Sequence, residues 1–263
     1  MKREISIFFT ALTYYTRIPC PGWVGYQESY LHQATRYFPL VGWIVGLVAG
    51  LLYLAGTYLF GAELGILLSM AGSILLTGAL HEDGFADACD GFGGGWTKER
   101  ILEIMKDSRV GTYGVVGLIL ILGFKFFSLQ QLVSNNSIQP ITPLLLFITA
   151  HALSRFVAST FIFTHTYVRL SEDSKAKPVA LGVENDNLGI AAALAFIPLL
   201  ALTYFAGKPL LAIVLIPLYL IKLYMGRYFT KWIGGYTGDS LGAAQQICEI
   251  IIYLTFIVLW KFT

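Results

Sequence analysis

Three aspartates stand at helical spacing in one short segment. Asp83, Asp87 and Asp90 are separated by four and then three residues, directly after an apolar stretch. At 3.6 residues per turn, their side chains fall within about 60° of one another on a helix face. Carboxylates crowded at the mouth of a membrane helix repel one another, and a divalent cation removes that repulsion. Because all the donors are oxygens, the spacing predicts a site for Mg²⁺ or Mn²⁺ rather than zinc.

Glu82 belongs to the same acidic segment but points about 100° away from Asp83 on a helix, so we expect it to be a secondary ligand. The alternative for the whole segment is a solvated acidic loop, since short charge clusters are common on surfaces. A solvated loop has no need of one-face spacing, nor of the triple glycine that follows the aspartates. The metal site is therefore the favoured interpretation.

Two neighbouring features are suited to an anion. Gly93 and Gly94 lie in a glycine run whose backbone amides can approach phosphate oxygens closely. Downstream, Lys106 and Arg109 are three residues apart and can contact phosphate, although both also suit a membrane anchor. Asp107 either binds metal or pairs with Arg109. A metal ion, carboxylates and basic side chains in one place together indicate transfer of a phosphoryl-linked group from an activated diphosphate to an alcohol.

The elements that must position these residues are membrane helices. The chain has 263 residues, of which 56% are hydrophobic and only 13% charged, with a mean hydropathy of +0.67. A net charge of +2 is too balanced to suggest nucleic acid as a partner. Apolar runs of spanning length predict an all-α, polytopic transmembrane bundle of about six or seven spans, forming a single domain over 1–263. The expected spans are 38–60, 62–80, 110–133, 141–164, 188–206, 209–226 and 246–261.

Basic residues predict the orientation of the bundle. Most of the 18 lysines and arginines fall on the side that holds residues 81–109. The positive-inside rule then places the N-terminus and the active-site segments in the cytoplasm. Small residues in several spans permit close helix packing in lipid and are compatible with a homo-oligomer. Arg155 and Glu249 lie inside spans, so we expect each to face a polar cavity or a partner.

The charged motifs resemble those of a known family, the cobalamin synthases or adenosylcobinamide-GDP ribazoletransferases. The run LTGALHEDGFADACDGFGGG, followed by ERILEIMKDSRVGTYG, is similar to the signature of that family. The resemblance extends to TRIP at 16–19, RYFPLVGWIVG at 36–46 and GGYTGDSLGA at 234–243, so it covers nearly the whole chain. It implies transfer of the adenosylcobinamide phosphate group from its GDP-activated form to α-ribazole or α-ribazole 5′-phosphate, with release of GMP. It also implies Mg²⁺ and the cytoplasmic (inner) membrane of a bacterium or archaeon.

The resemblance also suggests roles for individual residues. The metal would be held by Asp83, Asp87 and Asp90, with Glu82 as a helper, and the diphosphate by Lys106 and Arg109. Asp239 would bind a second metal or a hydroxyl of guanosine or ribazole, unless its glycine-rich segment only shapes a loop. His81 would be the general base, and a capping or supporting role is the alternative. Arg36 either anchors the interface or lines the cavity.

Two other functions are weighed against this one. CDP-alcohol phosphotransferases also hold metal on aspartates at a membrane interface, but their fuller pattern, with Ala-Arg soon after an Asp-Gly pair, is absent here. A cation or corrinoid transporter would use the intramembrane charges and the acidic mouth. The acidic triad lies in an interfacial segment instead of midway along broken helices, which argues against transport.

Overall fold

The computed structural model describes residues 2–25, 27–134, 141–169 and 185–262, and within these ranges the regular elements are helices joined by short loops. No strand occurs there; an isolated bridge joins Tyr167 and Tyr236. The long elements are α3 (Phe38–Phe60), α4 (Ala62–Thr77), α5 (Leu80–Gly94), α7 (Thr112–Ser134), α8 (Ile141–Thr164), α10 (Asn185–Ala206), α11 (Leu215–Ile233) and α12 (Gly238–Phe262). Shorter ones are α1 (Lys2–Tyr15), α2 (Glu28–Ala34), η1 (Thr35–Tyr37), α6 (Lys98–Ile104) and η2 (Pro209–Val214).

The described helices form a polytopic membrane bundle, as the hydropathy predicts. Six segments are long and apolar enough to cross a bilayer, and α4 with α5 would add a seventh if the pair were counted as one broken span. Two predicted spans are longer than expected: 209–226 continues to Ile233, and the last begins at Gly238 instead of 246. The added turns of α12 carry buried polar side chains, Ser240 and Gln245, whereas those of α11 carry the exposed Arg227, Thr230 and Lys231. Both kinds of polar residue lower the local hydropathy, so hydropathy alone underestimates these helices.

A sharp bend separates α4 from α5. The predicted span 62–80 ends at Thr77, and α5 leaves at 87° to α4. Gly78 and Ala79 both adopt the left-handed conformation, with φ of 65° and 58°. This conformation closes α4, since Ala79 N–H bonds to the Ile74 carbonyl at 2.9 Å. The bend turns the acidic segment out of the line of α4 and across the end of the bundle.

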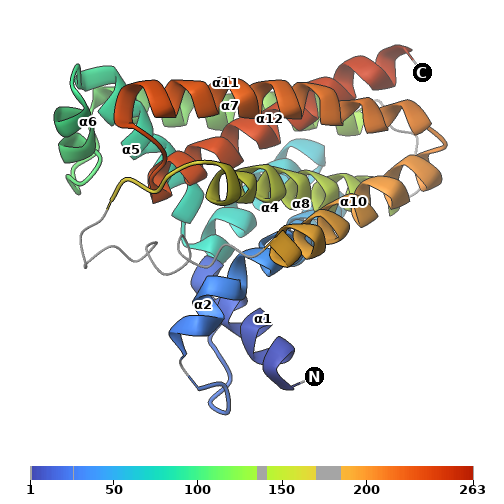
Figure 1. Ribbon diagram of the computed structural model, residues 1–263. Helices are drawn as coiled ribbons and strands as arrows, with labels where there is room; N and C mark the ends of the chain where they lie inside the picture. The colour runs from blue at the N-terminus through green and yellow to red at the C-terminus, as the bar shows by residue number, and fades with distance from the viewer. Residues whose placement is uncertain (1, 26, 135–140, 170–184, 263) are drawn as a thin grey trace.

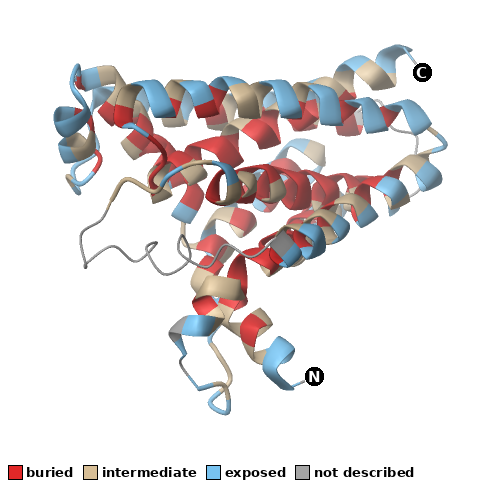
Figure 2. Cartoon of the chain, viewed as in Figure 1, coloured by how far each residue is buried: buried red, intermediate tan, exposed pale blue. Residues whose placement is uncertain are grey.

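Burial separates a central pair of helices from a lipid-facing ring. In their most apolar windows, 67% of the α8 residues and 61% of the α12 residues are buried, against 28% for α7, α10 and α11. Figure 2 shows this contrast, with buried residues concentrated along α8 and α12. The exposed faces of the outer helices are apolar, as contact with lipid requires.

Glycines bring α3 against α8. A Cβ at Gly46 would lie 2.6 Å from the Cα of Ile148, and one at Gly42 would lie 2.8 Å from the carbonyl carbon of His151. Such spacing of small residues lets membrane helices approach at backbone distance. The contact fixes α8, which carries Arg155, beside the first long helix.

One end of the bundle gathers the polar segments. Figure 1 shows α5 and α6 together at the end where α11 passes into α12, while the C-terminus lies at the opposite end. The α1 and α2 helices project from the side of the bundle. The acidic helix α5 packs against α7 and α12, so these two helices position its carboxylates.

Candidate active site

All three predicted aspartates lie on α5, but they differ in environment. Asp83 is exposed, Asp87 is half-buried and Asp90 is buried. Both carboxylate oxygens of Asp90 accept backbone hydrogen bonds, from Gly111 N–H at 2.7 Å and Gly114 N–H at 2.8 Å. A carboxylate in this position accepts hydrogen bonds from N–H groups that have no partner within the first turn of α7. Its negative charge also interacts favourably with the dipole of α7. Asp90 thus joins α5 to α7, and Asp83 and Asp87 are the carboxylates that remain open.

A fourth aspartate approaches from α12. Gly84 has no side chain, and a Cβ there would lie 3.0 Å from the Cα of Asp239. The start of α12 therefore packs directly on α5. Burial, together with the charges of Asp239 and Asp83, raises the pKa of Asp87 to about 7, while the charge of Arg169 opposes this rise. Asp83, Asp87 and Asp239 therefore lie close enough to affect one another electrostatically.

Local capping positions Asp239. The Thr237 hydroxyl accepts from Ser240 N–H at 3.1 Å, and the Ser240 hydroxyl accepts from Thr237 N–H at 3.3 Å. This reciprocal arrangement is a capping box at the start of α12. It fixes the first turn, from which Asp239 reaches an ion pair of 2.6 Å with Arg169. The glycine-rich segment around 234–238 thus does more than connect two spans.

The opposite face of α5 enters the protein interior. His81 and Glu82 are only 5% and 8% exposed. At 100° per residue, the His81 side chain points roughly 160° away from Asp83. Its ring lies 5.7 Å from the ring of Phe38, and Glu82 accepts from Gln246 Nε2 at 2.9 Å. The structure thus separates His81 from the open carboxylates and gives it interior neighbours.

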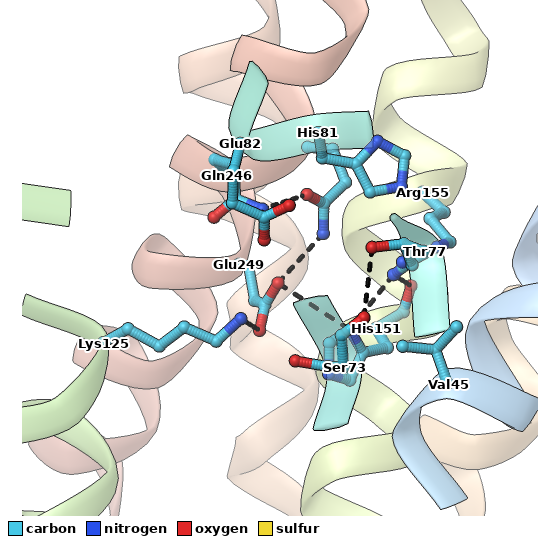
Figure 3. Close-up of a pocket in the computed structure, with 11 residues that line it drawn as sticks. Val45, Ser73, Thr77, His81, Glu82, Lys125, His151, Arg155, Gln246 and Glu249 are labelled. Carbon is cyan, nitrogen blue, oxygen red and sulfur yellow. Dashed lines mark hydrogen bonds and ion pairs between the residues drawn. The ribbon is translucent and has the colours of Figure 1, made fainter. Parts of the chain in front are cut away.

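The interior neighbours form a pocket of charged and polar groups inside the bundle. Figure 3 shows the side chains from several helices converging there. The lining residues are Val45, Ser73, Thr77, His81, Glu82, Lys125, His151, Arg155, Gln245, Gln246 and Glu249. Arg155 and Glu249 both have polar partners there, which is one of the two surroundings that the sequence predicted for them.

Glu249 is the centre of this pocket. Lys125 Nζ lies 2.7 Å from one of its oxygens, the Tyr253 hydroxyl donates to the same oxygen at 3.0 Å, and Gln245 Nε2 donates to the other at 2.9 Å. Arg155 Nη1 donates to the His151 carbonyl at 3.0 Å. Buried charges in a bilayer require such pairing. The network ties α7, α8 and α12 together beneath α5.

The predicted phosphate-contacting residues have other surroundings. Lys106 and Arg109 are exposed, and Arg109 Nη2 donates to Asp107 at 2.6 Å. The hydrogen bonds from Arg109 lower the pKa of Asp107 to about 2. The sequence left open whether Asp107 binds metal or pairs with Arg109, and the structure shows the pair.

Gly93 and Gly94 belong to the last turn of α5, although a loop was expected there. A Cβ at Gly93 would lie 2.6 Å from the ring of Tyr113, so this glycine allows close helix packing. Arg36 pairs with Glu4 at 3.3 Å and with the side chain of Gln33 at 2.7 Å. It therefore links α1 to the segment of α2 and η1, and its predicted role as an anchor at the membrane interface stays a prediction.

Comparison with known proteins identifies the family. A sequence model for the family described as cobalamin-5-phosphate synthase matches residues 7–257. The chain belongs to this family. It is 44% identical to the adenosylcobinamide-GDP ribazoletransferase of Shewanella amazonensis. The alignment spans 260 residues, which are 99% of this chain and 98% of the relative. The protein of that name from Shewanella oneidensis is 46% identical over 256 residues, covering 97% and 95%.

Membership in the cobalamin-5-phosphate synthase family makes the chain a transferase of cobalamin assembly. It disfavours the phospholipid-type phosphotransferase and the transporter. No solved structure matches the fold. The site features that sequence reasoning missed are Arg169 as the partner of Asp239 and the close approach at Gly84. The adjacent glutamines Gln245 and Gln246, unusual inside an apolar helix, were a usable signal for the interior network.

Proposed function

We propose that this chain transfers the adenosylcobinamide phosphate group from adenosylcobinamide-GDP to a hydroxyl of α-ribazole or α-ribazole 5′-phosphate, with release of GMP. A bond forms between the ribazole oxygen and the corrinoid-linked phosphorus, the bond from that phosphorus to the GMP oxygen breaks, and the hydroxyl proton is released. The observation that carries the proposal is the group of carboxylates where α5 meets α12, in a chain of this family.

The carboxylates fit Mg²⁺ chemically. Among the described residues, no three His, Cys, Asp or Glu side chains form a complete metal cage. Mg²⁺ seldom uses such a cage, because it is commonly held by one or two carboxylates together with water and substrate phosphates. Asp83 and Asp87 would supply these carboxylates, and Asp239 would add charge beside them. When bound, the ion would neutralise the diphosphate and stabilise charge on the departing GMP.

The protein's own groups have separable tasks in this reaction. The α5 carboxylates define where the diphosphate binds, and Asp90 keeps α5 against α7. The transition state of phosphoryl transfer is loose, so positioning and electrostatics contribute more than proton abstraction. His81, expected as a general base, lies in the interior pocket, where burial lowers its pKa well below the usual value. A role in fixing α5 suits this position better.

The distribution of charge supports one orientation of the bundle in the bilayer. The end of the bundle that carries α5 also carries Lys98, Arg100, Lys106, Arg109 and Arg169, whereas Lys208 and Lys261 lie toward the other end. The positive-inside rule supports a cytoplasmic position for the α5 end, in the inner membrane of the cell. Single cysteines placed at Arg100 and Lys208 should react with an impermeant thiol reagent from opposite sides of sealed vesicles.

The activity is tested by GMP release from the purified, detergent-solubilised protein. Release should require adenosylcobinamide-GDP, α-ribazole or its phosphate, and Mg²⁺ together. GMP formed without ribazole would indicate a hydrolase, and turnover of CDP-activated lipid alcohols would indicate the phospholipid-type reaction. Either outcome would contradict the proposal.

A further inference from the structure

We propose that Arg169 binds the diphosphate of the GDP-activated substrate, by exchanging its ion pair with Asp239 for phosphate oxygens. This inference rests on the proposed function and adds to it the residue that holds the activated group. Sequence reasoning assigned that task to Lys106 and Arg109, which are exposed side chains beyond the end of α6.

The backbone holds Arg169 at the site. Val168 N–H donates to the Tyr236 carbonyl at 3.0 Å, and Tyr236 N–H donates to the Thr166 carbonyl at 2.9 Å. The rings of Tyr167 and Tyr236 are also in contact, with centroids 5.4 Å apart. These two hydrogen bonds hold the segment after α8 against the turn before α12. Arg169 follows these residues directly, so its position depends on this fixed contact.

The guanidinium of Arg169 is enclosed and incompletely bonded. Its side chain is 16% exposed, as is that of Asp239, and the ion pair between them measures 2.6 Å. Nη2 also donates to the Met105 carbonyl at 3.1 Å. The buried Nε–H has no hydrogen-bond partner in the part of the chain that the structure describes. A buried donor without a partner is unfavourable, and a phosphate that accepts from Nε and Nη2 together would satisfy it in the fork geometry that arginine favours.

Charge balance explains why Arg169 pairs with Asp239 in this structure. When ionised, Asp83, Asp87 and Asp239 with Arg169 carry two net negative charges, which one divalent cation would neutralise. Arg169 acts on Asp87 as well as on Asp239. A cation held by these carboxylates would compete with the guanidinium for Asp239 and would reduce the repulsion between the site and anions. Arg169 could then donate to the oxygens of an incoming diphosphate.

The neighbouring basic side chains are less suited to binding the diphosphate. The Arg109 side chain is 87% exposed and is occupied by Asp107. An exposed pair of this kind contributes little and is screened by salt. Arg169, by contrast, lies where water is largely excluded and where a charge-assisted hydrogen bond is stronger. The enclosed guanidinium is therefore the better phosphate ligand.

The test compares nucleotide binding in full-length variants in detergent micelles with Mg²⁺. Arg169→Ala should weaken GDP binding about 10- to 100-fold, the range for one hydrogen-bonded charge. It should leave guanosine binding and Mg²⁺ affinity at least as strong as in wild type. Arg169→Lys, which keeps the charge but loses the fork, should lie between. Arg100→Ala is the matched control, since Arg100 forms an exposed pair with Glu103 at 2.7 Å and should change nothing.

Two further measurements separate binding from folding. The double variant Arg169→Ala/Asp239→Asn removes the carboxylate left unpaired by the single change, and it should still bind GDP weakly. Added guanidinium ion should lower the KM of Arg169→Ala for adenosylcobinamide-GDP. Unchanged GDP affinity in Arg169→Ala, or an equal loss of guanosine and GDP binding, would overturn the inference. If wild-type protein showed no Mg²⁺-dependent release of GMP, the proposed function itself would fail.

Discussion

Replacing Asp87 by Asn should stabilise the metal-free protein while abolishing its activity. In wild type, burial together with the charges of Asp239 and Asp83 raises the pKa of Asp87 from 3.8 to about 7. A carboxyl whose pKa is higher in the folded than in the unfolded state stabilises the fold fully at low pH. That contribution is lost as the pH rises through the folded value. Ionised Asp87 therefore destabilises the metal-free protein above about pH 7.

The magnitude follows from the change in pKa. A rise from 3.8 to about 7 corresponds to an upper limit of about 4 kcal/mol of unfolding free energy. Because Asp87 is only half-buried, solvent screening reduces this, and we expect about 1–2 kcal/mol. Asp87→Asn should gain that amount in EDTA at about pH 8. The gain should shrink as the pH falls from about 7 and vanish well below pH 3.8, where the wild-type carboxyl is protonated in both the folded and the unfolded state.

Mg²⁺ should reverse the order of stability. A ligand that binds only the folded state stabilises it, so wild type should gain stability as Mg²⁺ is added and the variant should not. Thermal unfolding of the solubilised protein, with and without EDTA from about pH 5 to pH 8, measures both effects, and GMP release measures turnover. Glu103→Gln is the control, because Glu103 is exposed and pairs with Arg100 on the surface of α6.

Two outcomes would refute this reasoning. If Asp87→Asn were less stable than wild type in EDTA at about pH 8, the crowding of the carboxylates would not be the dominant force at this site. If the variant kept both its turnover and its stabilisation by Mg²⁺, Asp87 would not be a metal ligand.

Three further predictions follow from the packing. Asp90→Ala should destabilise the protein by about 1–2 kcal/mol in thermal unfolding, because two N–H groups at the start of α7 lose their acceptor; Asp90→Asn should lose less, with an unchanged Mg²⁺ requirement for GMP release. Glu249→Gln should cost about 3–5 kcal/mol by leaving Lys125 unpaired, and Lys125→Met/Glu249→Gln should recover much of the loss, as a double-mutant cycle would measure. Gly46→Ala should lower the unfolding temperature, because its Cβ would lie 2.6 Å from a backbone atom of α8; a neutral result would contradict the tight α3–α8 contact.

The helices themselves were predictable from local information. Apolar runs of spanning length identified the membrane segments, and the spacing of Asp83, Asp87 and Asp90 indicated the helix that carries them. Both signals depend on neighbours within a few turns, which the sequence displays directly. The bend at 78–79 was not predicted, because Ala79 is a residue that rarely adopts a positive φ.

The functions of the individual carboxylates depended on contacts between distant parts of the chain. The helical spacing predicts the same role for all three aspartates. Asp90, however, accepts hydrogen bonds from backbone N–H groups more than 20 positions away in the sequence. Likewise, the exposure of Arg109 and the enclosure of Arg169 have no local signature. Each depends on which surfaces the other helices cover.

The sequence by itself therefore determined the class of this protein: a membrane bundle, an acidic helix at one end, and the family to which both belong. Only the tertiary structure decided which groups share the site. Asp239 and Arg169 meet α5 because Gly84 leaves room for α12, and Glu82 meets Gln246 across 164 positions of chain. Hydropathy and helical period report the environment of a residue along its own helix, whereas the position of a charge next to another charge is set by the packing of helices against one another.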